Sequence, residues 1–207
     1  MPSRVFLLSP ARSDGARGKL LLNPRAEFPL AAQLRAPHGA PIGEVFSFLS
    51  GLYFRGKLAY ARAFSAPPPG VAPAYVITTD RGLLAPEAHI TREDLDAFAQ
   101  VDIHTRGVSN PMFETPLRRD AERLAIDVEP STQIVLLGSI ASGKYIDTLL
   151  TIFAERLVFP GDFVGRGDMS RGGLMLRCVR EHGELTYVPV AGAVRHGKRP
   201  PKLERVR

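Results

Sequence analysis

The sequence predicts a single-domain α/β fold: a mixed, mostly parallel sheet flanked by helices, with an antiparallel strand pair near the C-terminus. Short apolar segments alternate with helical ones along most of the 207 residues, which is typical of a parallel sheet. Two expected strands near the end are joined by only a short turn, which indicates an antiparallel pair. No internal repeat divides the chain, so we expect residues 1–194 to form one α/β domain and residues 195–207 a basic, flexible tail.

The first half of the chain is predicted to hold two strands and a long apolar helical region. The strand at residues 5–8 is entirely apolar and ends at Ser9. Apolar residues recur at helical spacing within residues 42–64, where Gly51 and Gly56 offer places for this helix to break in two. The elements expected in this half are a strand at 5–8, a loop at 12–19, a helix at 25–35, one or two helices at 42–64, a linker at 65–73 and a strand at 74–79.

The second half begins with a clear helix start. Thr91 can accept a hydrogen bond from a free backbone N–H, and Glu93 and Asp94 favour the positive end of the helix dipole. The later elements then complete the sheet. We expect a helix at 116–126, a strand at 133–138, a helix at 143–154, a strand at 156–159, a glycine-rich loop at 160–173, and strands at 174–180 and 184–189.

The composition favours a cytoplasmic protein without a membrane partner. Apolar residues make up 44% of the chain and charged residues 23%, as in ordinary globular proteins. No apolar run approaches the roughly 20 residues of a membrane span, and the N-terminal run is too short for a signal peptide. The single cysteine, Cys178, excludes an internal disulfide and fits a reducing compartment. The histidines show no metal-ligand spacing, so we predict no metal or other cofactor.

The positive charge is concentrated in the tail. Residues 195–207 hold six Arg or Lys and one Glu, which gives +5 of the chain's net +6. Such a segment suits contact with a nucleic-acid backbone, although it would equally serve as a solvated end or a strap held by Leu203 and Val206. The tail residues proposed to contact nucleic acid are Arg195, Lys198, Arg199 and Lys202.

A glycine-rich turn after the 133–138 strand resembles a phosphate-binding loop. Gly138 and Gly143 have the spacing of that loop, and Lys144 follows as its lysine does. Tyr145 stands where a Ser or Thr would hold Mg²⁺, and few residues follow, so a P-loop NTPase is disfavoured. We expect instead a strand-to-helix turn that faces an anion. Its candidate ligand-binding residues are Ser139, Ser142 and Lys144.

Polar residues also follow the other expected parallel strands, where ligands of open α/β sheets bind. Ser9 and Thr78 are such candidates, although turns favour small polar residues for structural reasons too. In the 160–173 loop, Arg166 and Arg171 suit phosphate or carboxylate. Asp168, like Asp162, could orient these arginines or act as a general base; the alternative is a mobile loop with self-paired charges.

A third basic cluster lies on the 52–62 helix. Arg55, Lys57 and Arg62 alternate with tyrosines, a pattern that suits phosphate contact with base stacking. The alternative is a helix whose basic ends extend over the core to water.

Four of these segments, taken in order, resemble the YaaA-like family of bacterial peroxide-stress proteins. They are the strand into Ser-Pro-Ala at residues 9–11, the Gly-Leu-Leu run within residues 76–86, Ile-Ala-Ser-Gly-Lys-Tyr at 140–145 and Arg-Gly-Gly-Leu-Met within 170–177. The resemblance implies a DNA-binding stress-response protein. The family's helix–hairpin–helix insertion has little room in residues 12–73, so any nucleic-acid contact here would use the cleft and the tail.

The sequence therefore leads first to a nucleic-acid-binding protein, with DNA the expected partner, whose anion-binding cleft lies at the strand carboxyl ends. The alternative is an enzyme that acts on a nucleotide, nucleoside or base in the same cleft. In that reading Tyr145 or Asp168 would transfer protons and Arg171 would stabilise developing charge. A third reading is an accessory protein whose cleft docks a partner. The oligomeric state is not readable from the sequence.

Overall fold

The computed structural model describes residues 3–103, 109–141, 143 and 145–201, and it has the predicted α/β architecture. A six-stranded sheet has the order β4-β3-β1-β6-β7-β8. Its four central strands are parallel, and β4 and β8 pair antiparallel at the two edges. The strands are β1 (Arg4–Leu8), β3 (Ala74–Ile77), β4 (Leu83–Leu84), β6 (Gln133–Leu137), β7 (Leu157–Pro160) and β8 (Tyr187–Pro189).

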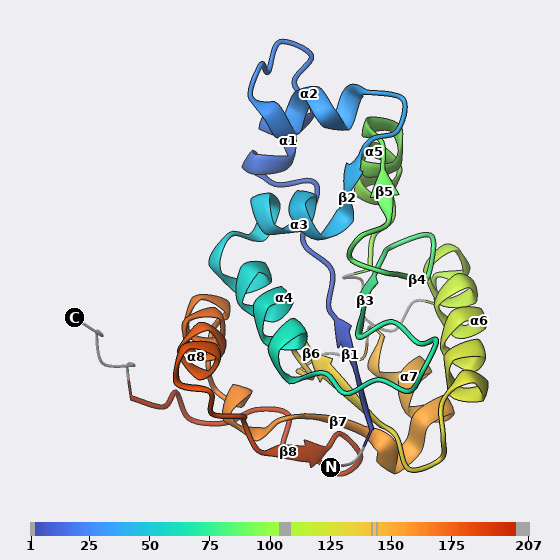
Figure 1. The fold of residues 1–207 in the computed structure, drawn as a ribbon, viewed down its shortest axis with the longest axis vertical. Coiled ribbons are helices and arrows are strands. Elements are labelled where there is room, and N and C mark those ends of the chain that lie inside the picture. The colour runs from blue at the N-terminus through green and yellow to red at the C-terminus, as the bar shows by residue number, and fades with distance from the viewer. Residues whose placement is uncertain (1–2, 104–108, 142, 144, 202–207) are drawn as a thin grey trace.

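Helices cover both faces of this sheet (Figure 1). On one side lie α4 (Leu52–Phe64) and α8 (Asp168–Glu181), which pack on each other; on the other lie α6 (Pro111–Asp127) and α7 (Ile146–Phe153). A smaller layer sits beyond the carboxyl ends of the strands. It contains α1 (Ala16–Leu22), α2 (Pro29–Arg35), α3 (Ile42–Ser50), α5 (Arg92–Gln100) and the two-stranded pair β2 (Ala40–Pro41) and β5 (His89–Ile90).

The central strand β1 forms the middle of the core. All of its residues are buried, and its register pairs Phe6 with Ala74 on β3 and with Val135 on β6. Strands that are apolar on both sides are expected when helices cover both faces of a parallel sheet. Each fully buried Leu, Val or Phe contributes about 1.5–3 kcal/mol relative to exposure, so this strand anchors the fold.

The strand order creates a crevice between β1 and β6. The chain passes from β1 to β3 on one side of β1, and later enters the sheet at β6 on the other side. The two connections leave through helices on opposite faces, α4 and α7 (Figure 1). In open α/β sheets ligands bind at such a switch point, beyond the carboxyl ends of the strands. Ser9 follows β1 and Ser139 follows β6, so both lie at this point.

Local signals explain several element boundaries. The long apolar helical region breaks at Gly51, whose φ of 59° lies in the left-handed region, whereas Gly56 continues α4. Thr91 caps α5 as predicted. Its hydroxyl accepts from the Asp94 backbone N–H, and the Asp94 carboxylate accepts from the Thr91 N–H.

Three expected segments differ from the structure. The 160–173 segment is not all loop, because α8 begins at Asp168. Residues 12–19 are not all loop, because α1 begins at Ala16. Residues 174–180 are helical rather than a strand, and the antiparallel pair near the C-terminus is formed by β7 and β8. A nearly continuous short apolar run fits a buried strand or a buried helix equally well. The buried positions of α8 recur at helical spacing: they are Arg171, Gly172 and Met175, with Cys178 and Val179 packed against the core.

No helix within the described part of the chain is both long and apolar enough to cross a membrane. Residues 195–201 form no regular secondary structure, and their backbone passes beside the segment that leads into α8. A Cβ placed on Gly165 would lie 2.2 Å from the Lys198 carbonyl oxygen. The first part of the basic tail is therefore in contact with the α/β domain.

Candidate functional site

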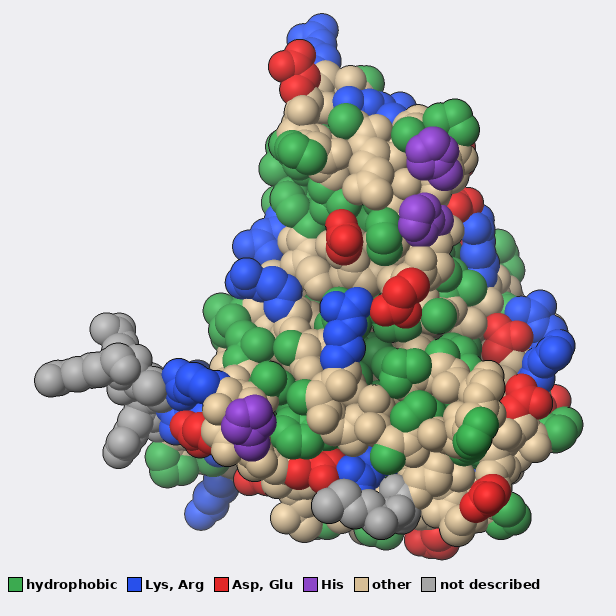
Figure 2. All heavy atoms as spheres, viewed as in Figure 1, with side chains coloured by type: hydrophobic (Ala, Val, Ile, Leu, Met, Phe, Trp, Pro, Cys, Tyr) green, Lys and Arg blue, Asp and Glu red, His purple; other side chains and the backbone are tan. Residues whose placement is uncertain are grey.

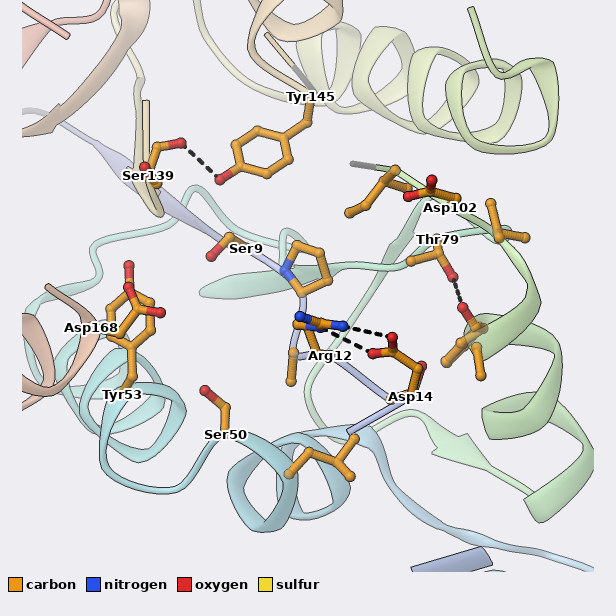
Figure 3. Close-up of a pocket in the computed structure, with 18 residues that line it drawn as sticks. Ser9, Arg12, Asp14, Ser50, Tyr53, Thr79, Asp102, Ser139, Tyr145 and Asp168 are labelled. Atoms are coloured by element: carbon orange, nitrogen blue, oxygen red, sulfur yellow. Dashed lines mark hydrogen bonds and ion pairs between the residues drawn. The ribbon is translucent and has the colours of Figure 1, made fainter. Parts of the chain in front are cut away.

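A cleft of about 680 Å³ opens at the carboxyl ends of β1, β3 and β6 (Figure 3). Four predicted site residues line it: Ser9, Ser139, Tyr145 and Asp168. They come from the ends of two strands and the beginnings of two helices, so Ser139, Tyr145 and the start of α8 face the same hollow. The cleft is thus at the switch point of the sheet, and it has the size of a small-molecule site.

Ser9 is joined to a buried lysine behind the cleft wall. The Lys57 Nζ lies 2.7 Å from the Ser9 carbonyl oxygen and 2.9 Å from Ser9 Oγ. Lys57 is only 1% exposed, while Ser9 itself borders the cleft. The predicted contact between Lys57 and nucleic acid is therefore wrong, because this side chain faces the core side of α4 rather than solvent.

Burial controls the protonation of Lys57. Loss of water around the amine lowers its pKa to about 7, and the charge of Arg171 acts in the same direction, while the Asp168 carboxylate raises it. The aromatic rings of Tyr53 and Phe54 lie 4.3 Å and 4.9 Å from Nζ, and their faces favour the charged form. Burial thus makes the neutral amine far more accessible than it is for an ordinary lysine.

Tyr53 places a hydroxyl without a hydrogen-bond partner among the described residues near Lys57 and Ser9. The ring lines the cleft, and its buried oxygen makes no hydrogen bond among the described residues. Burial raises the pKa of this phenol to about 12, while nearby Arg171 and Ser9 lower it. An unpaired buried hydroxyl costs about 1–3 kcal/mol, so Tyr53 lowers the stability of the folded protein at this place.

Tyr145 folds back over the glycine-rich turn. Its hydroxyl donates to the Ser139 carbonyl oxygen at 3.0 Å, and burial raises the pKa of the phenol above its usual range. A Cβ on Gly138 would lie 2.7 Å from this hydroxyl and 2.8 Å from the Ser9 Cβ. The phenol and Ser9 therefore fill the space beside Gly138, which has no room for a side chain. Ser142 and Lys144, also predicted to bind the ligand, lie outside the described residues.

The arginines of the 160–173 segment have structural partners. Arg171 is buried and donates twice to the Phe163 carbonyl oxygen, at 3.2 and 3.0 Å, with its third nitrogen 3.6 Å from Asp168. Arg166 lies outside the cleft lining and donates to the Asp162 carbonyl oxygen and to Ser170 Oγ. Arg171 thus places a positive charge behind the cleft wall, near Tyr53 and Lys57. The side chain of Arg166 does not line the cleft.

Thr78 does not reach the cleft either. It is fully buried, and its hydroxyl donates to the Gly82 carbonyl oxygen and accepts from the Arg81 N–H, both at 3.0 Å. These bonds close the turn between β3 and β4. The neighbouring Thr79 lines the cleft instead, because successive residues at a strand end point to opposite sides.

The remaining basic residues lie at the surface. Arg55 is exposed on α4, and Arg62 is exposed and paired with Glu87 at 3.0 Å. In the tail, Arg195, Lys198 and Arg199 are exposed, and Lys202 lies outside the described residues. On the face seen in Figure 2, Lys and Arg side chains are interspersed with Asp and Glu.

The charges at the cleft are nearly balanced. Among the described lining residues, Arg12 forms a two-pronged ion pair with Asp14, and Asp102 and Asp168 add two further carboxylates. Lys57 and Arg171 supply positive charge behind the wall. In the same described part of the chain, no three His, Cys, Asp or Glu side chains are grouped closely enough to hold a metal ion.

Lys57 and Tyr53 are the site residues whose role the sequence did not predict. Both lie on the buried side of α4, together with Tyr60 and Ala61. Helical spacing assigns Lys57 to the core side of the helix, where a lysine must lose its water on folding. This spacing could have indicated a buried lysine from the sequence.

A scan against protein-family models finds no match, and searches of curated proteins and of solved structures find no relative of this chain. The resemblance to the YaaA-like family stays a prediction from the four sequence segments. The function is therefore argued from the site itself.

Proposed function

We propose that the protein is an enzyme that acts on a nucleotide, nucleoside or base bound in this cleft. The observation that carries the proposal is the meeting of Ser9, Lys57, Tyr53 and Tyr145 at the switch point of the sheet. A buried amine with a pKa near 7 next to a hydroxyl at a cleft is an arrangement suited to proton transfer. A lysine that serves only to solubilise the surface would keep its amine in water.

The walls of the cleft suit a flat ring joined to a polar group. Apolar and aromatic side chains, among them Leu49, Phe98 and Ile103, form one part of the lining. Hydroxyl groups, such as those of Ser50 and Thr79, form another. Because carboxylates balance the positive charges, the cleft favours an uncharged nucleoside or base over a highly charged nucleotide.

Several predicted residues receive narrower roles in this proposal. Tyr145, with its raised pKa, would be a neutral hydrogen-bond donor at pH 7 rather than a base. Asp168 is the first residue of α8, and its exposed carboxylate borders the cleft. The negative charge of this carboxylate raises the pKa of Lys57. Arg171 would act through the field it exerts on Tyr53 and Lys57 rather than by touching the ligand.

A thermal-shift panel of nucleosides, bases and nucleotides tests the proposal. A ligand at 100 times its Kd stabilises the folded protein by about 2.7 kcal/mol, which is readily measured. Ser50→Phe would fill the cleft and should remove the ligand-induced shift relative to its own baseline. Ser131→Phe makes the same change at an exposed site outside the cleft and should keep it. No stabilisation by any member of the panel would count against this ligand class.

We propose nucleic-acid binding as a second candidate, supported by the exposed cations of the tail. Arg195, Lys198 and Arg199 are exposed beside the 164–165 segment, close in sequence to Asp168 at the cleft. The resemblance to the YaaA-like family implies DNA as the partner and a role in stress response. The single cysteine supports a cytoplasmic location.

The salt dependence of binding to duplex and single-stranded DNA tests this second candidate. The logarithm of the binding constant should fall steeply with that of the salt concentration, by about one unit of slope per phosphate contact. Deleting residues 195–207 should reduce that slope by a few units, whereas Arg62→Ala, which removes a cation already paired with Glu87, should change it little. Absence of binding at low salt would eliminate this candidate.

A further inference from the structure

We propose that Ser9 is a nucleophile and Lys57 its general base, so that the cleft cleaves or transfers an acyl group held by an ester or amide bond. This inference rests on the proposed function of the cleft as an active site, and it specifies the reaction and the reacting bond of the substrate. Serine–lysine pairs perform such chemistry on several unrelated folds, where geometry and roles rather than sequence position define them.

The positions of the two side chains match these roles. Ser9 borders the cleft, while Lys57 lies behind it with Nζ 2.9 Å from Ser9 Oγ. A substrate in the cleft would therefore meet the hydroxyl first, with the amine on the far side. The required spacing between a nucleophile and its base, about 2.6–3.2 Å, is already present without a ligand.

The hydrogen bonds of Lys57 suit a neutral amine. Its two partners are the carbonyl oxygen and the hydroxyl of the same residue, Ser9. A neutral amine donates one N–H to the carbonyl and accepts the hydroxyl proton on its lone pair, so each contact is satisfied. In that arrangement the carbonyl contact orients the amine, and the lone pair faces the proton that must be removed.

The charged and titratable groups around Lys57 keep this neutral form accessible. Burial lowers the pKa to about 7; Arg171 on α8 acts in the same direction, whereas Asp168 on α8 opposes it. Tyr53 on α4 faces the amine with its ring and stays protonated at neutral pH, because its own pKa is raised to about 12. The amine can thus both accept and return a proton near pH 7.

Tyr53 provides the donor that such a reaction needs. When Ser9 Oγ attacks the acyl carbon, a C–O bond forms, the carbonyl π electrons move to oxygen, and the hydroxyl proton passes to Lys57 Nζ. The Tyr53 hydroxyl lies near Ser9 and Arg171 and makes no hydrogen bond of good geometry among the described residues, so it would donate to that oxyanion.

The second half of the reaction restores both groups. The bond from the acyl carbon to the leaving group breaks, and the leaving oxygen or nitrogen takes the proton from Lys57. Water then attacks the acyl-serine and gives a proton to the amine, and Ser9 Oγ leaves and regains a proton. The net reaction is hydrolysis of the ester or amide, with no group altered on the protein.

A fluorophosphonate probe tests the inference directly. Attack by Ser9 Oγ forms an O–P bond and releases fluoride, so intact mass and peptide mapping reveal the adduct. We expect one adduct, on Ser9, with a labelling rate that rises with pH through about 7 as Lys57 loses its proton. Ser9→Ala should abolish labelling, whereas Ser131→Ala, which changes an exposed serine outside the cleft, should keep it.

Two further variants separate the roles. Lys57→Met should slow labelling at least about 100-fold and remove its pH dependence, and Tyr53→Phe should slow it about 10- to 100-fold. If Lys57→Met does not fold, the pH dependence of the wild-type rate decides the role of the lysine. No Ser9 adduct in the folded wild-type protein, or a rate independent of pH between 6 and 8, would overturn the inference. Binding of a nucleoside without labelling would overturn it as well, while leaving the proposed function intact.

Discussion

Gly56 of α4 and Gly172 of α8 face each other where the two helices cross, and neither position has room for a side chain. A Cβ on Gly56 would lie 2.7 Å from the Gly172 carbonyl oxygen, and a Cβ on Gly172 would lie 2.7 Å from that of Leu52. At this contact the backbones of the two helices approach each other closely. It is this crossing that places Tyr53 and Lys57 of α4 beside Asp168 and Arg171 of α8.

Replacing Gly172 by alanine should therefore destabilise the fold and disturb the site. A Cβ at this position meets backbone atoms, which cannot move aside, so we expect a loss of about 1–3 kcal/mol in the free energy of unfolding, measured by urea denaturation. Gly183→Ala is the matched control, because a Cβ there meets nothing within 4 Å; it should change stability by less than about 0.5 kcal/mol. Equal effects of the two changes would contradict the close crossing.

The stability of the protein should rise with pH between about 7 and 9 because of Lys57. Its pKa is about 7 in the folded protein, against 10.5 for an ordinary lysine, so between these values the unfolded chain binds more protons. The cost of burying the amine is thus complete below pH 7 and decreases as pH rises, by up to about 1.4 kcal/mol per pH unit.

Urea denaturation of Lys57→Met at several pH values checks this prediction. The variant has no amine to titrate, so the slope of stability against pH should be flatter than in the wild-type protein. Lys19→Met removes an exposed lysine and should keep the wild-type slope. A slope unchanged by Lys57→Met would mean that this amine does not lose its water on folding.

The sheet and the location of the cleft could be predicted from the sequence, because both follow from apolar strands and the polar residues after them. Residues 5–8, 74–79, 133–138 and 156–159 were each expected as strands, and β1, β3, β6 and β7 lie there. Parallel strands end at one edge, so Ser9, Ser139 and Tyr145 were expected to converge, and they line one cleft.

The inner side of the site could not be predicted, because it depends on how helices pack. Alternating arginines and tyrosines on α4 resembled a nucleic-acid surface, yet the rotation of the helix on the sheet directs Lys57 inward. In the same way, the glycines at 172 and 173 resembled a loop. Gly172 instead permits the close approach of two backbones, and no local pattern distinguishes these two uses of glycine.

Thr78 should support the fold and not the ligand, although it follows a strand as Ser9 does. Its hydroxyl bonds to the Gly82 carbonyl oxygen and the Arg81 N–H within a buried turn. Thr78→Val would leave the Arg81 N–H without this partner, while the Gly82 carbonyl oxygen would keep its bond from the Thr78 backbone N–H. The change should cost about 1–3 kcal/mol, whereas Thr78→Ser keeps the hydroxyl and should cost less. Ligand-induced thermal shifts should be the same in both variants, and a selective loss in Thr78→Val would show that this residue reaches the ligand.

Two buried tyrosines of α4 should respond in opposite ways to loss of their hydroxyl groups. Tyr60 accepts from the Leu185 N–H at 2.8 Å and lies 2.8 Å from the Tyr187 hydroxyl, which donates to Glu184. Tyr60→Phe leaves the Leu185 N–H without this partner, so we expect a loss of about 1–3 kcal/mol in unfolding free energy.

Tyr53→Phe should instead leave stability unchanged or raise it by up to about 1 kcal/mol, because it removes a buried hydroxyl that has no partner among the described residues. The same variant should slow any reaction of Ser9, whereas Tyr60→Phe should not at temperatures where it is folded. Urea denaturation and fluorophosphonate labelling of both variants measure the two effects separately. A destabilised Tyr53→Phe with normal labelling would make Tyr53 a structural residue. The opposite result is expected, since a hydroxyl kept at a cost to stability beside the proposed nucleophile Ser9 is typical of a functional site.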